Sequence, residues 1–115
     1  MAYDQYLADR ILRVFEKEKT IAIEKKMFGG IGFMVDDKMC IGIYKVGLMA
    51  RVDPEKVGEL VKRKGAEQMI HGGRTMKGYL TIFPEGYDLD DDLEFWVLKC
   101  LEFNPKTKKS KKKKK

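Results

Sequence analysis

Two glycine-flanked basic segments, residues 25–33 and 72–78, are the strongest candidates for chemistry in this sequence. Glycine reaches positive φ and lets another group approach its backbone, because it has no Cβ. In the second segment, Gly72 and Gly73 would present a nest of backbone N–H groups, with Arg74 and Lys77 beside it. Such a nest binds a phosphate or a carboxylate. The alternative is a structural loop whose arginine pairs with a carboxylate elsewhere in the domain.

The first segment contains cations that would join this loop if a sheet brought them together. Lys25, Lys26 and Arg51 occupy expected strand positions. Successive strand residues point to opposite faces, so both lysines join one patch only if the bend at Gly29 and Gly30 intervenes. The candidate anion- or partner-binding residues are Lys26, Arg51, Gly73, Arg74 and Lys77. The alternatives are isolated solvated charges or ion pairs with nearby glutamates.

Neither glycine segment matches a nucleotide-binding signature. Val35 stands where a dinucleotide fingerprint has its third glycine, and that segment runs into a strand where phosphate recognition needs a helix. Tyr79 and Leu80 replace the Lys-Ser/Thr pair of a P-loop. The single histidine, His71, and the two cysteines, Cys40 and Cys100, are scattered over three elements, a poor basis for a zinc site. We therefore expect a non-enzymatic protein with no catalytic residue, metal or cofactor.

The charge of the chain divides into two parts. The net charge is +6, but the last ten residues contain eight lysines: Lys106, Lys108, Lys109, Lys111, Lys112, Lys113, Lys114 and Lys115. Without them, 16 basic residues face 18 acidic ones. We expect residues 105–115 to be a disordered tail that binds DNA or RNA nonspecifically through its charge. The alternatives are a solubilising or ribosome-associating appendage, or contact with an anionic membrane, although no apolar anchor accompanies the lysines.

The elements that would position these residues follow from hydrophobic periodicity. Helices are expected over residues 4–18, 54–64 and about 93–103, and strands over 20–25, 31–35, 39–44, 48–52, about 68–70 and 77–83. Short turns between strands exclude parallel neighbours, which need a crossover of a dozen residues or more. The sequence therefore predicts an α+β fold, with a central antiparallel sheet and helices on one face. Residues 1–104 would form this single domain.

Over about residues 1–103, the chain resembles the TfoX/Sxy N-terminal domain family of bacterial proteins. The most specific matching segments are Met-Phe-Gly-Gly at 27–30 and Gly-Arg-x-Met-Lys-Gly at 73–78. Further matching segments are residues 1–4, 7–10, 31–35, 39–40, 48–52 and 84–86, and the helix around Trp96. The resemblance implies a small α+β domain and, in better understood members, a regulator of natural competence that assists the cyclic-AMP receptor protein. Those members carry a second, DNA-binding domain, and here a lysine tail stands in its place.

These features lead to one expected function and one alternative. We expect a cytoplasmic regulatory module whose body binds a protein partner, such as a transcription factor, while the tail adds nucleic-acid affinity. No membrane-spanning run or secretory signal is expected, and both cysteines are expected to be reduced. A homodimer is compatible with the sequence. The alternative is small-anion binding, or an unrecognised enzyme, centred on Gly72–Gly78.

Overall fold

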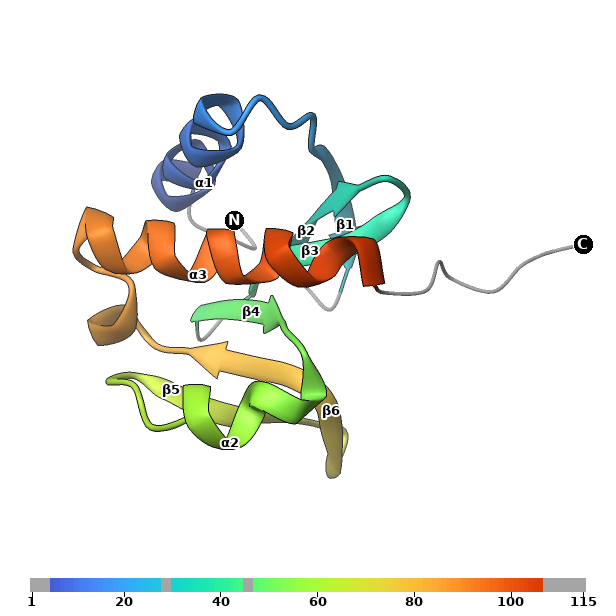
Figure 1. The fold of residues 1–115 in the computed structure, drawn as a ribbon, viewed down its shortest axis with the longest axis vertical. Helices are drawn as coiled ribbons and strands as arrows, with labels where there is room; N and C mark the ends of the chain where they lie inside the picture. The colour runs from blue at the N-terminus through green and yellow to red at the C-terminus, as the bar shows by residue number, and fades with distance from the viewer. Residues whose placement is uncertain (1–4, 28–29, 45–46, 107–115) are drawn as a thin grey trace, which may run out of the picture.

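The computed structural model describes residues 5–27, 30–44 and 47–106 of the chain, with Met27 and His71 described by their backbone only. Within these ranges the chain forms a six-stranded antiparallel sheet in the order β1-β2-β3-β4-β6-β5. The helices α1, α2 and α3 all lie on the viewer's side of the sheet in Figure 1. The expected α+β class, with one antiparallel sheet and helices on one face, is confirmed.

The element bounds agree with the expected order. The helices are α1 (Gln5–Lys17), α2 (Val57–Leu60) and α3 (Asp90–Phe103), and the strands are β1 (Ile23–Met27), β2 (Gly30–Val35), β3 (Lys38–Tyr44), β4 (Gly47–Arg51), β5 (Ala66–His71) and β6 (Arg74–Ile82). Short 3₁₀ turns, Pro54–Lys56, Pro84–Gly86 and Asn104–Lys106, precede α2, follow β6 and follow α3.

Several elements have other bounds than their sequence-based ranges: β1 begins at Ile23, β6 at Arg74 and α3 at Asp90, and the largest differences are in α2 and β5. The second helix was expected to reach residue 64, but α2 ends at Leu60. Its interior contains Gly58, a poor helix former, which favours a short helix. The extended piece expected near residues 68–70 is a full strand, β5, because it pairs along β6. Pairing with a neighbouring strand is a tertiary contribution that a single-segment pattern does not contain.

The core lies between the sheet and the two long helices. From α1 it receives Leu7, Ala8, Ile11 and Phe15, and from α3 it receives Leu93, Trp96, Val97 and Cys100. The sheet supplies a row of residues paired across five strands, Ile31, Ile43, Leu48, Ile82 and Ala66. This face of the sheet is therefore the one that the helices cover.

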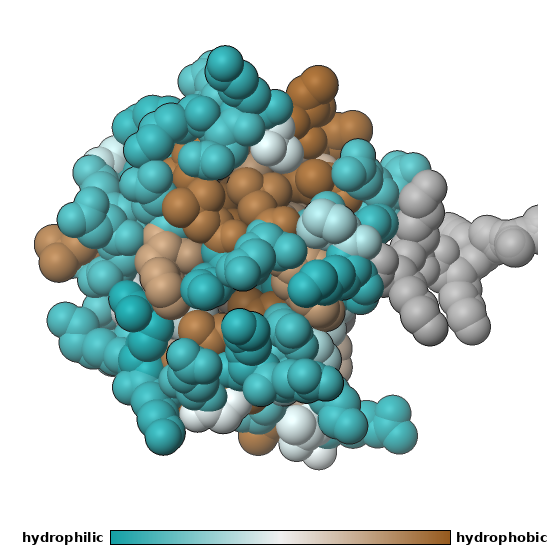
Figure 2. Space-filling model, viewed as in Figure 1, coloured by the Kyte–Doolittle hydropathy of each residue, from teal (hydrophilic) through white to brown (hydrophobic). Residues whose placement is uncertain are grey.

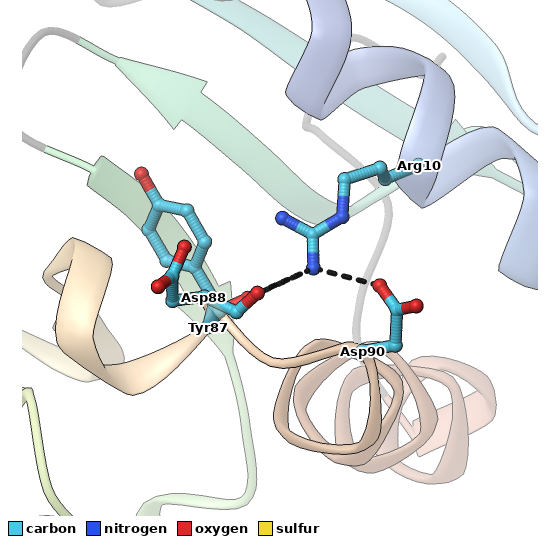
Figure 3. A network of polar contacts seen from close by, with 4 residues as sticks. All are labelled: Arg10, Tyr87, Asp88 and Asp90. Atoms are coloured by element: carbon cyan, nitrogen blue, oxygen red, sulfur yellow. Dashed lines mark hydrogen bonds and ion pairs between the residues drawn. The ribbon is translucent and has the colours of Figure 1, made fainter.

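Arg10 links the first helix to the start of the last one (Figure 3). Its guanidinium donates to the carbonyl oxygens of Tyr87 and Asp88, at 3.2 and 3.0 Å, and to the Asp90 carboxylate at 3.0 Å. The Arg10 side chain is only 10% exposed, whereas that of Asp90 is 95% exposed. The helix α3 begins at Asp90, before the expected start near residue 93, so that Asp90, Asp91 and Asp92 occupy its first turn and complement the helix dipole.

Candidate binding faces of the sheet and helix layer

The glycine pair of the second basic segment forms the tip of the β5–β6 hairpin. His71 pairs with Arg74, so Gly72 and Gly73 are a two-residue loop. Their φ values are +60° and +80°, the combination that a type I′ turn requires at both central positions. A Cβ at either glycine would meet no atom within 4 Å. Backbone conformation, and not a close neighbour, therefore accounts for glycine at these two positions.

The two cations of this segment are exposed on β6. Neither Arg74 nor Lys77 forms an ion pair with any residue that the structure describes. Beyond them the strand is irregular, since Gln68 pairs with Leu80 whereas Ile70 pairs with Thr75. The pairing that sequence reasoning proposed for the arginine, with a carboxylate of the domain, is not seen among the described residues.

Gln68 holds this irregular stretch together and was missed at the sequence level. Its side-chain amide donates to the carbonyl oxygens of Met76 and Tyr79, at 2.9 and 3.1 Å. The Gly78 carbonyl accepts a further bond from the Val52 backbone N–H at 2.8 Å. A partly exposed glutamine in a strand gives no sequence signal for this role, because its partners are backbone atoms of another strand.

The first basic segment divides between the two faces of the sheet. Lys26 pairs with Ile31, a core residue, and so lies at the edge of the helix-covered face. Lys25 pairs with Gly32, and that row continues across the sheet on the other face through Gly42, Met49 and Thr81. Both lysines belong to β1, where they alternate between its two faces, and Gly29 of the expected bend lies outside the described residues. Of the five candidate residues, Lys26 is therefore separated from Arg51, which pairs with Tyr79.

The sheet face opposite the helices carries a second hydrophobic cluster, and we call it the methionine face. Met39, Met49 and Met69 are buried in it, and Met34, Met76, Tyr44 and Tyr79 are partly buried against them. All seven residues come from strands. The Met49 side chain lies over Gly42, where a Cβ would be 2.9 Å from its methyl carbon. Arg74 precedes Met76 by two residues, so strand alternation places it on this face as well.

Arg51 is a partly buried cation at the end of β4, beside the tyrosines of the methionine face. Its guanidinium lies 5.6 Å from the centroid of the Tyr79 ring, within cation–π range, and donates to the Met39 carbonyl oxygen at 3.5 Å. On the same face, Tyr44 and Thr81 share a hydrogen bond of 2.9 Å between their hydroxyl groups. This face therefore combines a partly buried cation with two partly exposed tyrosines.

The two thiols are buried in the core beside these strands. Burial raises the pKa of Cys40 to about 12, against a smaller lowering by the Arg51 guanidinium. Burial also raises the pKa of Cys100 well above its ordinary value, as does Cys40, and the backbone N–H of Arg51 opposes both. Both cysteines are free thiols, as expected. Because a thiol, unlike a thiolate, is a poor nucleophile, neither is placed for covalent chemistry at neutral pH.

A groove opens on the helix side, between the segment after α1 and the C-terminal half of α3. It has a volume of about 650 Å³ and is lined by apolar and charged residues. The apolar ones include Ile21, which is 83% exposed, and the partly buried Leu98 and Leu101 of α3. In Figure 2 hydrophobic residues gather between α1 and α3. Sequence reasoning missed this groove, because Ile21 resembled an ordinary inward strand residue.

Other classes of site receive no support from the described residues. Residues 5–27, 30–44 and 47–106 contain no group of three or more His, Cys, Asp or Glu side chains arranged to hold a metal ion. In the same ranges, no helix is long and apolar enough to cross a membrane. The tail lysines Lys108 to Lys115 lie outside the described residues, and Lys106 is exposed at the end of the last 3₁₀ turn.

Comparison with protein families supports the resemblance seen in the sequence. The family model of the TfoX N-terminal domain matches residues 19–104, about three quarters of the chain. The match begins after α1 and ends where α3 gives way to its 3₁₀ turn. Comparisons with curated proteins and with solved structures gave no match. The matched residues include all six strands, α2 and α3, and so the chain belongs to the TfoX N-terminal domain family.

Proposed function

We propose that this protein is a non-enzymatic regulatory module that binds a protein partner, such as a transcription factor, in the groove between the segment after α1 and α3. The observation that carries the proposal is an isoleucine, Ile21, that is 83% exposed beside the apolar side chains of Leu98 and Leu101. An exposed apolar surface rimmed by polar residues is typical of protein interaction sites. Family membership supports a regulatory role through the activity of better understood members.

The shape and charge of the groove favour an apolar anchor with polar flanks. Its volume, about 650 Å³, accommodates a few side chains of a partner segment. Four charged residues of both signs border it: Glu18, Lys19, Asp36 and Glu102. Mixed charge at the rim would orient a partner more than it would add affinity. The raised pKa values of the two buried thiols support the non-enzymatic part of the proposal, because a neutral thiol is a poor nucleophile.

A photo-reactive amino acid in place of Ile21 would test the groove in living cells. We expect it to form a covalent adduct with one transcription regulator, identified by mass spectrometry. The same substitution at Ile70, which is 63% exposed on β5, is the matched control and should not form this adduct. Equal adducts from both positions, or adducts only with unrelated abundant proteins, would contradict the proposal.

The lysine tail would add affinity for nucleic acid to this module. Eight lysines displace the counterions condensed on phosphates, which gives strong but sequence-independent attraction. Lysines without arginine forks or aromatic side chains do not read base sequence. Selectivity for a promoter would therefore come from the protein partner in the groove, and the tail would hold the complex near DNA.

One observation favours a second candidate function, small-anion binding at the β5–β6 hairpin. Arg74 and Lys77 are exposed beside an open glycine turn and form no ion pair with the described residues. A thermal-shift titration with inorganic phosphate and nucleotides tests this candidate. It predicts a shift that disappears in Arg74→Ala and persists in Arg13→Ala, an exposed arginine of α1. A flat titration would exclude it.

A further inference from the structure

We propose that the methionine face binds single-stranded nucleic acid, with bases stacked on Tyr44 and Tyr79 and phosphates held by Lys25, Arg51 and Arg74. This goes beyond the proposed function, in which a protein occupies the helix-side groove and only the tail meets nucleic acid. Four observations lead to it: the direction of one tyrosine ring, the position of the second, the placement of cations, and helices confined to the opposite face.

The first observation is that the Tyr44 ring lies along the sheet. Its hydroxyl is 2.9 Å from the Thr81 hydroxyl on β6, two strands away from β3. Two strand spacings are about 10 Å, so the side chain must extend across β4 to make this bond. Directly opposite Tyr44 on β4 is Gly47, which has no side chain to obstruct it. The Tyr44 side chain therefore lies across the sheet and is partly exposed, so that part of its ring is accessible to a planar ligand.

The second observation is that Tyr79 adjoins the end of this ring. It precedes Thr81 by two residues on β6, so the two side chains lie on the same face about 7 Å apart along the strand. The Tyr79 ring is partly exposed and has the Arg51 guanidinium 5.6 Å from its centroid. Neighbouring aromatic rings and a guanidinium form the surface on which unpaired bases stack.

The third observation concerns charge across the face. Lys25 is exposed at the β1 end of the row that runs through Gly32, Gly42 and Thr81. Arg51 and Arg74 lie toward the other end, on β4 and β6. From β1 to β6 is four strand spacings, about 19 Å. Glu67 on β5 is the acid of this row. These cations stand out because the chain without its tail lysines has more acidic than basic residues.

The whole arrangement favours a single strand over a duplex. An antiparallel sheet with helices on one face and aromatic side chains on the other stacks two or three bases in known RNA-binding domains. Paired bases are inaccessible to such rings, so a duplex would contact only the cations. An acidic protein segment would also use the cations, but it would not depend on the two tyrosine rings. The tyrosines therefore distinguish the three ligands.

The test measures binding of the full-length protein to a fluorescent oligothymidylate and to a duplex of equal length, over a range of salt concentrations. Phosphate contacts of the tail weaken steeply with salt, whereas base stacking does not. At a salt concentration that abolishes duplex binding, we expect single-strand binding to persist. Tyr44→Leu and Tyr79→Leu should each weaken it about tenfold or more. Tyr44→Phe, which keeps the ring, should retain most of the affinity.

The matched control is Tyr6→Leu, which removes a tyrosine that is 68% exposed on α1, in the helix layer. It should leave the single-strand affinity unchanged. The circular dichroism signal of the buried Trp96 shows whether the Tyr44 and Tyr79 variants fold. If one of them does not fold, variants of the exposed cations Lys25 and Arg74 still test the proposal. Lys25→Gln and Arg74→Gln should each lower the salt slope, and Lys26→Gln and Arg13→Gln should not.

Three results would overturn the proposal. Single-strand and duplex binding could disappear together as salt rises, which would assign all binding to phosphate contacts. The Tyr44 and Tyr79 variants could bind like Tyr6→Leu, or the Lys25 and Arg74 variants like their controls, which would remove the methionine face from the site. Finally, the variants of the methionine face could keep single-strand binding but lose the protein adduct that the photo-reactive residue at Ile21 forms in cells. That result would make the methionine face a protein-binding surface.

Discussion

At the scale of single residues, one partly buried charge, that of Arg10, connects a helix near the start of the chain with a helix near its end. It reaches from α1 to two backbone carbonyl groups and one carboxylate in the segment that begins α3. Backbone acceptors do not depend on which side chains surround them, so this contact orients α3 through the path of its main chain. The partly buried guanidinium keeps its hydrogen bonds where water has limited access.

This geometry predicts that the two partners of the Arg10–Asp90 ion pair contribute differently to the free energy of unfolding. Arg10→Ala should lower the free energy of unfolding by about 1–2 kcal/mol, because it leaves two carbonyl groups without their donor. Asp90→Asn should change it by less than about 0.5 kcal/mol, because Asp90 is 95% exposed. Denaturant unfolding monitored by fluorescence measures both, with Arg13→Ala as control. Equal losses for Arg10→Ala and Asp90→Asn would show that the carboxylate, and not the carbonyl groups, carries the stabilisation.

The buried thiols predict a loss of stability at high pH. A folded-state pKa of about 12 for Cys40, against an ordinary 9.0, means that the folded protein holds a proton that the unfolded chain releases in this window. Stability from burying the neutral thiol is complete below pH 9 and falls as pH rises from about 9 toward 12, by up to about 1.4 kcal/mol per pH unit for each thiol. Cys100 acts in the same direction.

Unfolding free energies of the wild type and of Cys40→Ala, measured from pH 8 to pH 11, test this dependence. Lysines and tyrosines also titrate in this range, so the difference between the two pH profiles is the informative quantity. The decline should be shallower in the variant, which has lost one of the two thiols. Parallel profiles would show that Cys40 ionises in the folded state without a penalty.

At the scale of elements, glycine has opposite consequences at two ends of the α2 segment. Gly65 has φ +79°, and a Cβ there would lie 2.6 Å from the Gly86 backbone nitrogen. Gly58 lies within α2, where a Cβ would meet no atom within 4 Å. The first glycine allows the chain after α2 to pack directly on the turn after β6, and the second only weakens a helix.

The matched pair Gly65→Ala and Gly58→Ala makes this difference measurable. Gly65→Ala should lower the free energy of unfolding by about 2 kcal/mol or more, because both its φ and its backbone neighbour exclude a methyl group. Gly58→Ala should raise it by about 0.5–1 kcal/mol, since alanine restricts the unfolded chain and favours a helix. Thermal and denaturant unfolding both report the result. A neutral Gly65→Ala would mean that the two turns separate readily.

At the scale of the whole molecule, the two faces of the sheet differ in what covers them and in their side chains. Helices cover one face and form the main core, and their outer surface carries the groove beside Ile21. The other face carries methionines, tyrosines and cations supplied by strands alone among the described residues. The two proposed sites therefore lie on opposite sides of one sheet and share no residue.

The division of charge predicts two components of nucleic-acid binding. Replacing the eight tail lysines with glutamine should reduce the magnitude of the slope of log K against log salt for duplex DNA by several units, at most about 7. Fluorescence anisotropy over a salt series measures this slope. Single-strand binding at high salt should survive the replacement, because the methionine face is intact. An unchanged duplex slope would remove the tail from the nucleic-acid interface.

Local patterns in the chain were sufficient to predict the fold class, the two long helices and the short turns between antiparallel strands. Each depends on neighbours a few residues apart: apolar residues repeating every three or four positions, strands alternating in period two, and turn residues between them. The opposite orientation of Lys25 and Lys26 followed from the same period. The family followed from short motifs whose spacing is itself a local property.

Only the tertiary structure decided which of the candidate side chains share a surface. Lys26 and Arg51 are separated because the pairing register sets the face of every residue in a row, and that register depends on strands distant in the sequence. The same register aligned Lys25, Gly42 and Thr81 across the sheet, and it let Tyr44 reach a hydroxyl two strands away. Burial of both thiols likewise arises from packing α3 on the sheet, a contact between segments that no local pattern encodes.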